Sequence, residues 1–183
     1  MFITHSIRAF LILVLSSWCL TAYAQDDSRG SGGTSNAKAQ SGNIHALIVG
    51  ISDYNETDLQ LDYADNDAIL FKEYLTKAEG HPEDNIRLLI NDDAIALNIV
   101  QQLKSIANKA ETGDTVYLYF AGHGDVVNDF GKKAGFLLAA DANANQEYYS
   151  GGVIPLAFLN ETVLPNFTER NIKVILILDA CKL

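Results

Sequence analysis

The chain has 183 residues, of which 48% are hydrophobic and 20% are charged. This size and balance are typical of one globular domain with a substantial apolar core. Acidic residues outnumber basic ones by 23 to 13, which gives a net charge of −10. Because nucleic acids and anionic membranes attract basic proteins, the charge argues against both as partners.

The first 24 residues have the pattern of a secretory signal peptide. Arg8 supplies a positive start, residues 9–20 are largely apolar, and Ala22-Tyr23-Ala24 has the small residues of a cleavage site. The apolar run is shorter than the ~20 residues that span a bilayer, and an uncleaved anchor is the alternative. We therefore expect an exported protein, periplasmic or secreted, with no membrane attachment after cleavage.

Cleavage would leave one cysteine. Cys19 leaves with the signal, so only Cys181 remains and no internal disulfide can form. A lone cysteine often serves as a small buried apolar side chain. The sequence around it must decide between that role and a chemical one.

A domain is expected to follow a flexible linker. Residues 25–43 are rich in Gly, Ser, Asn, Asp and Gln and contain almost no apolar side chains. The folded domain is expected over residues 44–183. Short apolar runs predict strands at 44–51, 85–90, 115–120 and 172–178, and residues 135–139 suggest one arm of a hairpin.

Helical spacing of apolar residues separates these runs. It predicts helices over 62–77, from Asp92 or Asp93 to about 110, and over 156–163 after Pro155. Asp62 is expected to cap the first helix, and Gly113 to stop the second. Strands that alternate with helices predict an α/β fold, a three-layer α/β/α sandwich with a mostly parallel sheet.

Two predicted strands run into residues that carry chemistry. The third strand leads into His123 and the fourth leads into Cys181. Reactive groups in such sheets lie beyond the carboxyl ends of the strands, so neighbouring strands would bring imidazole and thiol together. A free thiol has a pKa of ~8.5, and a nearby imidazole can accept its proton and later protonate a leaving amine. We predict His123 and Cys181 as a catalytic pair; the alternative is a structural histidine and a core cysteine.

These residues resemble those of caspase-like cysteine peptidases, especially metacaspases and their bacterial relatives. The segment Tyr119-Phe120-Ala121-Gly122-His123-Gly124 resembles their strand-His-Gly element, and Asp179-Ala180-Cys181 resembles their D-x-C element. Residues 45–51 with Tyr54 resemble the first strand, and 61–70 resemble the start of the first helix. His123 and Cys181 are 58 residues apart (181 − 123), similar to the spacing in caspases. Legumain-type peptidases share both strand ends and are the nearest competing family.

The resemblance implies further site residues. The N–H groups of Gly124 and Cys181 would bind the oxyanion, and Asp67 and Asp179 would line the S1 pocket. No Lys or Arg occurs in residues 52–71, where caspases proper supply an arginine for an acidic P1 residue. The acidic pair therefore favours cleavage after Arg or Lys. Ala121 departs from the family pattern, since metacaspases usually have Ser there.

The resemblance also suggests that the catalytic domain, the caspase-like p20 portion over 44–183, is truncated after Cys181. We expect a cysteine endopeptidase acting on proteins or peptides, weakly active or inactive alone and in need of a complementary C-terminal caspase-like segment. The alternative is a catalytically inert, caspase-like binding module. No cofactor or metal site is expected, with calcium dependence left unassigned. A nucleotide-binding domain lacks support, since the chain has no phosphate-binding glycine loop.

Overall fold

The computed structural model describes residues 42–129, 131–143 and 151–182. The expected signal peptide, residues 1–24, and the linker up to residue 41 lie outside the described residues. Within the described ranges, no helix combines the length and the apolar character needed to cross a bilayer.

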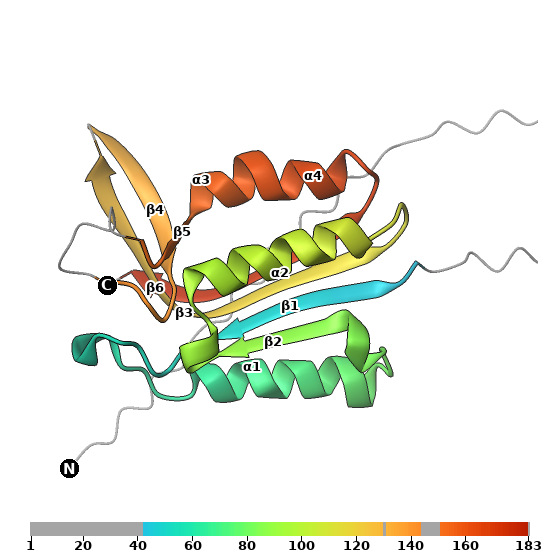
Figure 1. Ribbon diagram of the computed structural model, residues 1–183, viewed down its shortest axis with the longest axis horizontal. Coiled ribbons are helices and arrows are strands. Elements are labelled where there is room, and N and C mark those ends of the chain that lie inside the picture. Colours follow the sequence, from blue (N-terminus) through green and yellow to red (C-terminus); the bar gives the residue numbers. More distant parts are fainter. Residues whose placement is uncertain (1–41, 130, 144–150, 183) are drawn as a thin grey trace, which may run out of the picture. The chain divides into compact units, whose positions relative to one another are not determined.

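In the described part of the chain, a six-stranded sheet forms the centre of the domain (Figure 1). Its strands follow the order β2-β1-β3-β4-β5, and β6 also pairs with β3. Four strands run parallel to one another: β1 (Ile44–Gly50), β2 (Ile86–Ile90), β3 (Thr115–Asp129) and β6 (Lys173–Lys182). The antiparallel strands are β4 (Lys132–Leu138) and β5 (Val153–Pro155). The predicted α/β class with a mostly parallel sheet is confirmed.

Helices cover both faces of the sheet, with α1 (Ala64–Glu73) on one side and α2 (Ala96–Lys109), α3 (Leu156–Phe158) and α4 (Leu164–Thr168) on the other (Figure 1). π-helical turns continue α1 at Tyr74–Ala78 and join α3 to α4 at Leu159–Val163. The three expected helices therefore form, the third of them from several segments.

Alternation along β1 explains the two helical layers. Ala46 and Ile48 belong to a core cluster with Ala68 and Leu75 of the first helical segment. Leu47 and Val49, one residue out of phase, belong to a larger cluster with α2 and α4. Because successive side chains of a strand point to opposite faces, a continuous apolar run such as β1 buries both of its faces.

The structure differs from the sequence-based expectation at the helix ends. Asp62 does not cap α1; the cap position is Tyr63, which has a positive φ of 75°. Helix α2 begins after a short 3-10 turn, Asn91–Asp93, and its Ala96 N–H donates to Asp141 Oδ1 at 2.9 Å. Asp141 follows β4, so this cap comes from a distant part of the chain, which local sequence signals do not reveal.

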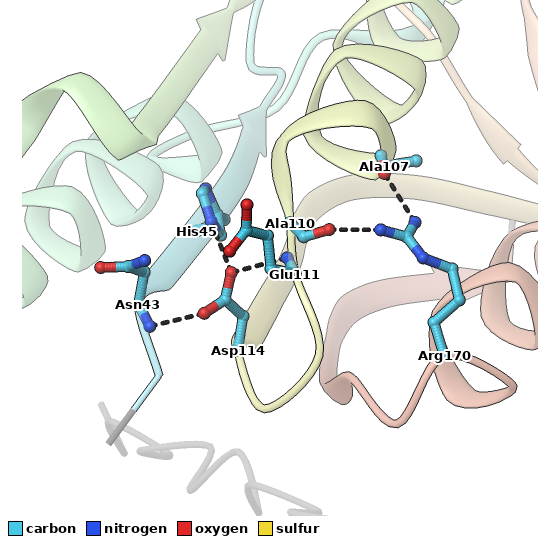
Figure 2. A network of polar contacts seen from close by, with 7 residues as sticks. All are labelled: Asn43, His45, Ala107, Ala110, Glu111, Asp114 and Arg170. Carbon is cyan, nitrogen blue, oxygen red and sulfur yellow. Dashed lines mark hydrogen bonds and ion pairs between the residues drawn. The ribbon is translucent and has the colours of Figure 1, made fainter. Parts of the chain in front are cut away.

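Helix α2 ends before the glycine expected to stop it. Its last residue is Lys109, and Gly113 takes a positive φ of 92° in the following turn. The Arg170 guanidinium donates to the Ala107 carbonyl at 2.7 Å and to the Ala110 carbonyl (Figure 2). A long-range cation thus satisfies the carbonyl groups that the helix leaves unpaired.

Asp114 ties together the amino-terminal ends of β1 and β3 (Figure 2). Its carboxylate accepts the Asn43 N–H at 2.7 Å, the Glu111 N–H at 2.8 Å and a bond from His45 Nε2 at 3.2 Å. Asp114 and His45 are both buried, so His45 has a structural role. Burial opposes ionisation of Asp114, but these hydrogen bonds outweigh it and hold the pKa of the carboxyl below its ordinary value of 3.8.

We predict that Asp114→Asn destabilises the domain by about 1–3 kcal/mol at neutral pH, because buried donors lose their ionised acceptor. Because the pKa of Asp114 is lower in the folded state, its ionised carboxylate stabilises the wild-type domain above pH 3.8. This stabilisation is lost as the pH falls through the folded-state pKa. The difference in stability between the wild type and Asp114→Asn therefore becomes smaller in acid. Urea unfolding at neutral pH and at about pH 3 measures both effects. Asp84→Asn, at an exposed position, is the matched control; equal stability of the two variants would contradict the prediction.

Candidate active site

Strand pairing brings the two predicted catalytic residues to one place. The parallel register of β3 and β6 runs from Thr115 opposite Lys173 to Gly124 opposite Lys182. Within it, the Cα of His123 is paired with the Cα of Cys181. The condition on which the catalytic hypothesis depends, that the two strands are neighbours, is therefore met.

His123 lies inside a strand rather than in a loop after one. β3 was expected to end at residue 120 but continues to Asp129, since its second half pairs with β4 from Gly124 opposite Leu137 to Asp129 opposite Lys132. β6 likewise extends past the expected end, to Lys182. The extra antiparallel pairing gives this part of the main chain a regular, supported conformation.

The imidazole of His123 contacts a main-chain carbonyl. Its Nε2 lies 3.0 Å from the Leu59 oxygen, which belongs to the short 3-10 turn Thr57–Leu59. A carbonyl oxygen only accepts hydrogen bonds, so Nε2 carries the proton and Nδ1 is the basic nitrogen of the neutral ring. This tautomer leaves Nδ1 available to accept a proton from a nucleophile.

Burial keeps the ring in that neutral form. It lowers the pKa of His123 below the ordinary value of 6.5, and the bond to the Leu59 carbonyl opposes this shift more weakly. A general base must be unprotonated at the working pH. The environment therefore keeps His123 unprotonated near neutral pH, which is the state that a general base requires.

Tyr54 also contacts His123. Its hydroxyl accepts the His123 main-chain N–H at 2.8 Å, and the two ring centroids are 5.3 Å apart at an interplanar angle of 46°. Neither this contact nor the Leu59 carbonyl was predicted. In the sequence, Tyr54 contributes only to the resemblance of residues 45–51 to the first strand of caspase-like peptidases. A main-chain carbonyl has no sequence motif that could reveal it.

The two predicted S1 residues come from different elements. Asp67 is on α1 and Asp179 is on β6, and both are exposed. Each lies close enough to Tyr119 to affect its ionisation: burial is the main cause that raises the pKa of Tyr119 to about 12, and the charges of Asp67 and Asp179 add to it. Two carboxylates that are 112 positions apart in the chain (179 − 67) therefore approach one tyrosine.

The predicted oxyanion donors occupy neighbouring strands. Gly124 is a buried residue of β3, and Cys181 belongs to β6, one register position before Lys182. Their role in binding an oxyanion stays a prediction. Within the described ranges, no group of three or more His, Cys, Asp or Glu residues is arranged to hold a metal ion.

A match to a protein-family model identifies the family of this chain. The model of the caspase domain matches residues 43–182, which is most of the chain. The chain belongs to the caspase domain family. The predicted family resemblance is thereby confirmed, and the family is one of cysteine peptidases.

Individual relatives are similar over shorter stretches. Metacaspase-6 of Arabidopsis thaliana is 32% identical over 84 residues, which cover 43% of this chain and 23% of the relative. Metacaspase-1 of Eremothecium gossypii is 29% identical over 94 residues, covering 48% and 21%. A probable protease of a Desulfuromonadales bacterium is 36% identical over 95 residues, covering 43% and 12%. The matched stretches thus span no more than about a quarter of these relatives.

A solved structure supports the fold independently. The crystal structure of a Geobacter sulfurreducens protein superposes with a TM-score of 0.61 at 17% identity, covering 76% of this chain and 50% of that protein. At this level of identity the likeness concerns the fold, and it agrees with the caspase-like α/β arrangement of the sheet and its helices.

We predict that His123 titrates below 6.5, because its imidazole loses hydration when buried. Two-dimensional ¹H–¹⁵N spectra of the histidine side chains, recorded across the pH range, give the midpoint and the tautomer. His123→Gln assigns the signal by its disappearance. A midpoint above 6.5, or a neutral ring protonated on Nδ1, would contradict the environment described for His123.

Proposed function

We propose that the protein is a cysteine endopeptidase in which His123 and Cys181 form the catalytic dyad. The observation that carries this proposal is their paired position on β3 and β6 in a caspase domain. The tautomer and lowered pKa of His123 support it, since together they give a neutral ring with an unprotonated Nδ1 near neutral pH. Thiol-based peptide hydrolysis needs such a base.

The proposed reaction proceeds in two steps. His123 takes the thiol proton, the sulfur attacks the scissile carbonyl, and main-chain N–H groups of Gly124 and Cys181 stabilise the oxyanion. The imidazolium then protonates the leaving amine, which departs as the acyl-enzyme forms. Water, deprotonated by the same imidazole, hydrolyses the thioester and regenerates the thiol.

Charge favours a basic P1 side chain. Asp67 and Asp179 both approach Tyr119, and Asp179 is only two positions before Cys181. A guanidinium or ammonium group placed between two carboxylates is attracted by both. Residues 52–71 contain no cation that would instead select an acidic side chain. These features support cleavage after Arg or Lys.

The edge of β6 supports a further part of the proposal, a complementary C-terminal segment as partner. Among the described strands, β6 pairs only with β3, and its Leu178 is 42% exposed. An apolar strand with one unpaired edge is a natural place for strand addition.

Export of the protein remains a proposal that is based on the pattern of the N-terminal residues alone.

A peptide chloromethyl ketone tests the dyad, because alkylation requires a reactive thiol but not complete turnover. We expect stoichiometric labelling at position 181 of the intact chain, none at that position in Cys181→Ala, and labelling there slowed at least about a hundredfold in His123→Ala. Intact mass and peptide mapping measure the modification. His81→Ala is the matched control, since His81 lies in a loop after the first helical segment. Labelling independent of His123 would refute the proposed base.

The side chain at P1 of the reagent tests specificity. We expect Arg and Lys reagents to label faster than an Asp reagent, and Asp67→Asn and Asp179→Asn each to slow the Arg reagent by about tenfold. A norleucine reagent should react with all variants at one rate, which separates charge recognition from damage to the thiol. Asp58→Asn, on an exposed residue of the 3-10 turn, is the control. Faster labelling by the Asp reagent would overturn the basic specificity.

A further inference from the structure

Tyr54 makes three separate contacts around the candidate dyad. The residue is 4% exposed. Its hydroxyl accepts the His123 N–H at 2.8 Å and donates to the Leu138 carbonyl of β4 at 3.3 Å. Its ring packs at a tilt against the imidazole, at a centroid separation of 5.3 Å. One side chain therefore contacts both the main chain and the ring of His123.

We propose that Tyr54 is the positioning residue of the dyad, holding the His123 imidazole against the Leu59 carbonyl. The hydroxyl fixes the main chain at His123, and the aromatic ring restricts where the imidazole can turn. This inference rests on the proposed peptidase function for its catalytic consequence, although the geometry that it describes does not depend on activity.

The loop that carries Tyr54 also carries the carbonyl that binds His123. This loop, residues 52–61, closes on itself through the Leu61 N–H and the Ser52 carbonyl at 2.9 Å. Inside it, Gln60 Nε2 donates to the Tyr54 carbonyl at 2.7 Å. The two contacts on His123 therefore belong to one internally bonded unit, and displacing Tyr54 should also disturb the Leu59 contact.

Three further hydrogen bonds attach this loop to the rest of the domain. The Asn55 N–H donates to the Ala140 carbonyl at 3.0 Å, just after β4. The side-chain oxygen of Asn91 accepts the N–H groups of Ser52 at 2.9 Å and Asp53 at 3.0 Å. Because its base is anchored in this way, the loop can act as a fixed support for the imidazole rather than as a mobile strap.

Gly122 provides the space that Tyr54 needs. A Cβ atom at this position would lie 2.7 Å from the Tyr54 hydroxyl oxygen, closer than any normal contact. The residue beside the catalytic histidine therefore allows the hydroxyl to reach the His123 N–H. Burial raises the pKa of Tyr54 to about 12, although the bond from His123 opposes this, so the hydroxyl keeps its proton for Leu138 at neutral pH.

Tyr54→Phe in the full chain tests the proposal, because it keeps the ring and removes only the hydroxyl. Tyr117→Phe is the matched control: it makes the same change in β3, where the Tyr117 ring contacts Phe71. We expect the His123 amide to exchange with solvent about tenfold faster in Tyr54→Phe, as one hydrogen bond is lost. The Nε2-protonated tautomer of His123 should lose population, with no change in Tyr117→Phe. These readouts do not require catalysis.

Kinetics of Cys181 alkylation give the catalytic arm of the test. We expect Tyr54→Phe to lower the maximal alkylation rate about ten- to a hundredfold, with reagent affinity changed less than about twofold. Gly122→Ala, which pushes the hydroxyl away, should have the same pattern. Circular dichroism and melting temperature confirm that each variant folds.

The outcomes separate this inference from the proposed function. Unchanged amide exchange and tautomer in Tyr54→Phe would overturn the positioning role, whatever the alkylation rate. Altered exchange and tautomer with an unchanged alkylation rate would also overturn it, because the support would then not serve the chemistry. If the unmodified chain does not react with the reagent at all, the proposed dyad fails instead, and the NMR arm still decides whether Tyr54 positions His123.

Discussion

The parallel pairing of β3 with β6 is the constraint on which the rest of the site depends. It spans ten register positions, and the pair formed by His123 and Cys181 is the ninth. A shift of one residue along either strand would place a different residue of β6 opposite His123. Apolar side chains of both strands belong to the core, so the energy of core burial also maintains the alignment at the site.

The buried polar contacts of Asp114 and the candidate dyad lie toward opposite ends of β3. Asp114 and His45 lie at the amino-terminal ends of β3 and β1, where they join the sheet to the turn after α2. His123 lies near the carboxyl end of the β3 segment that pairs with β6. Buried polar groups at the first end have all their partners within the fold, whereas the second end leaves Asp67 and Asp179 exposed.

Sequence patterns predicted the elements whose cause is local and missed those whose cause is distant. β1 and β2 were found because they are short, mostly apolar runs, and α2 because its buried residues recur at helical spacing. The start of α2 was misplaced, since its cap is Asp141 from beyond β4. The length of β3 was underestimated, because the strand beyond Gly124 exists through its pairing with β4. The same distinction holds at the site: side chains with characteristic chemistry were found, whereas the Leu59 carbonyl was not.

The carbonyl partner of His123 has a consequence for proton delivery. If a carboxylate accepted this hydrogen bond, its full negative charge would stabilise a protonated His123 ring. The Leu59 oxygen carries only the partial charge of a carbonyl dipole. An imidazolium formed there is consequently a stronger acid than one paired with aspartate. In the proposed reaction, such an acid gives up its proton readily to the leaving amine, so this weakly stabilised cation fits the step in which the acyl-enzyme forms.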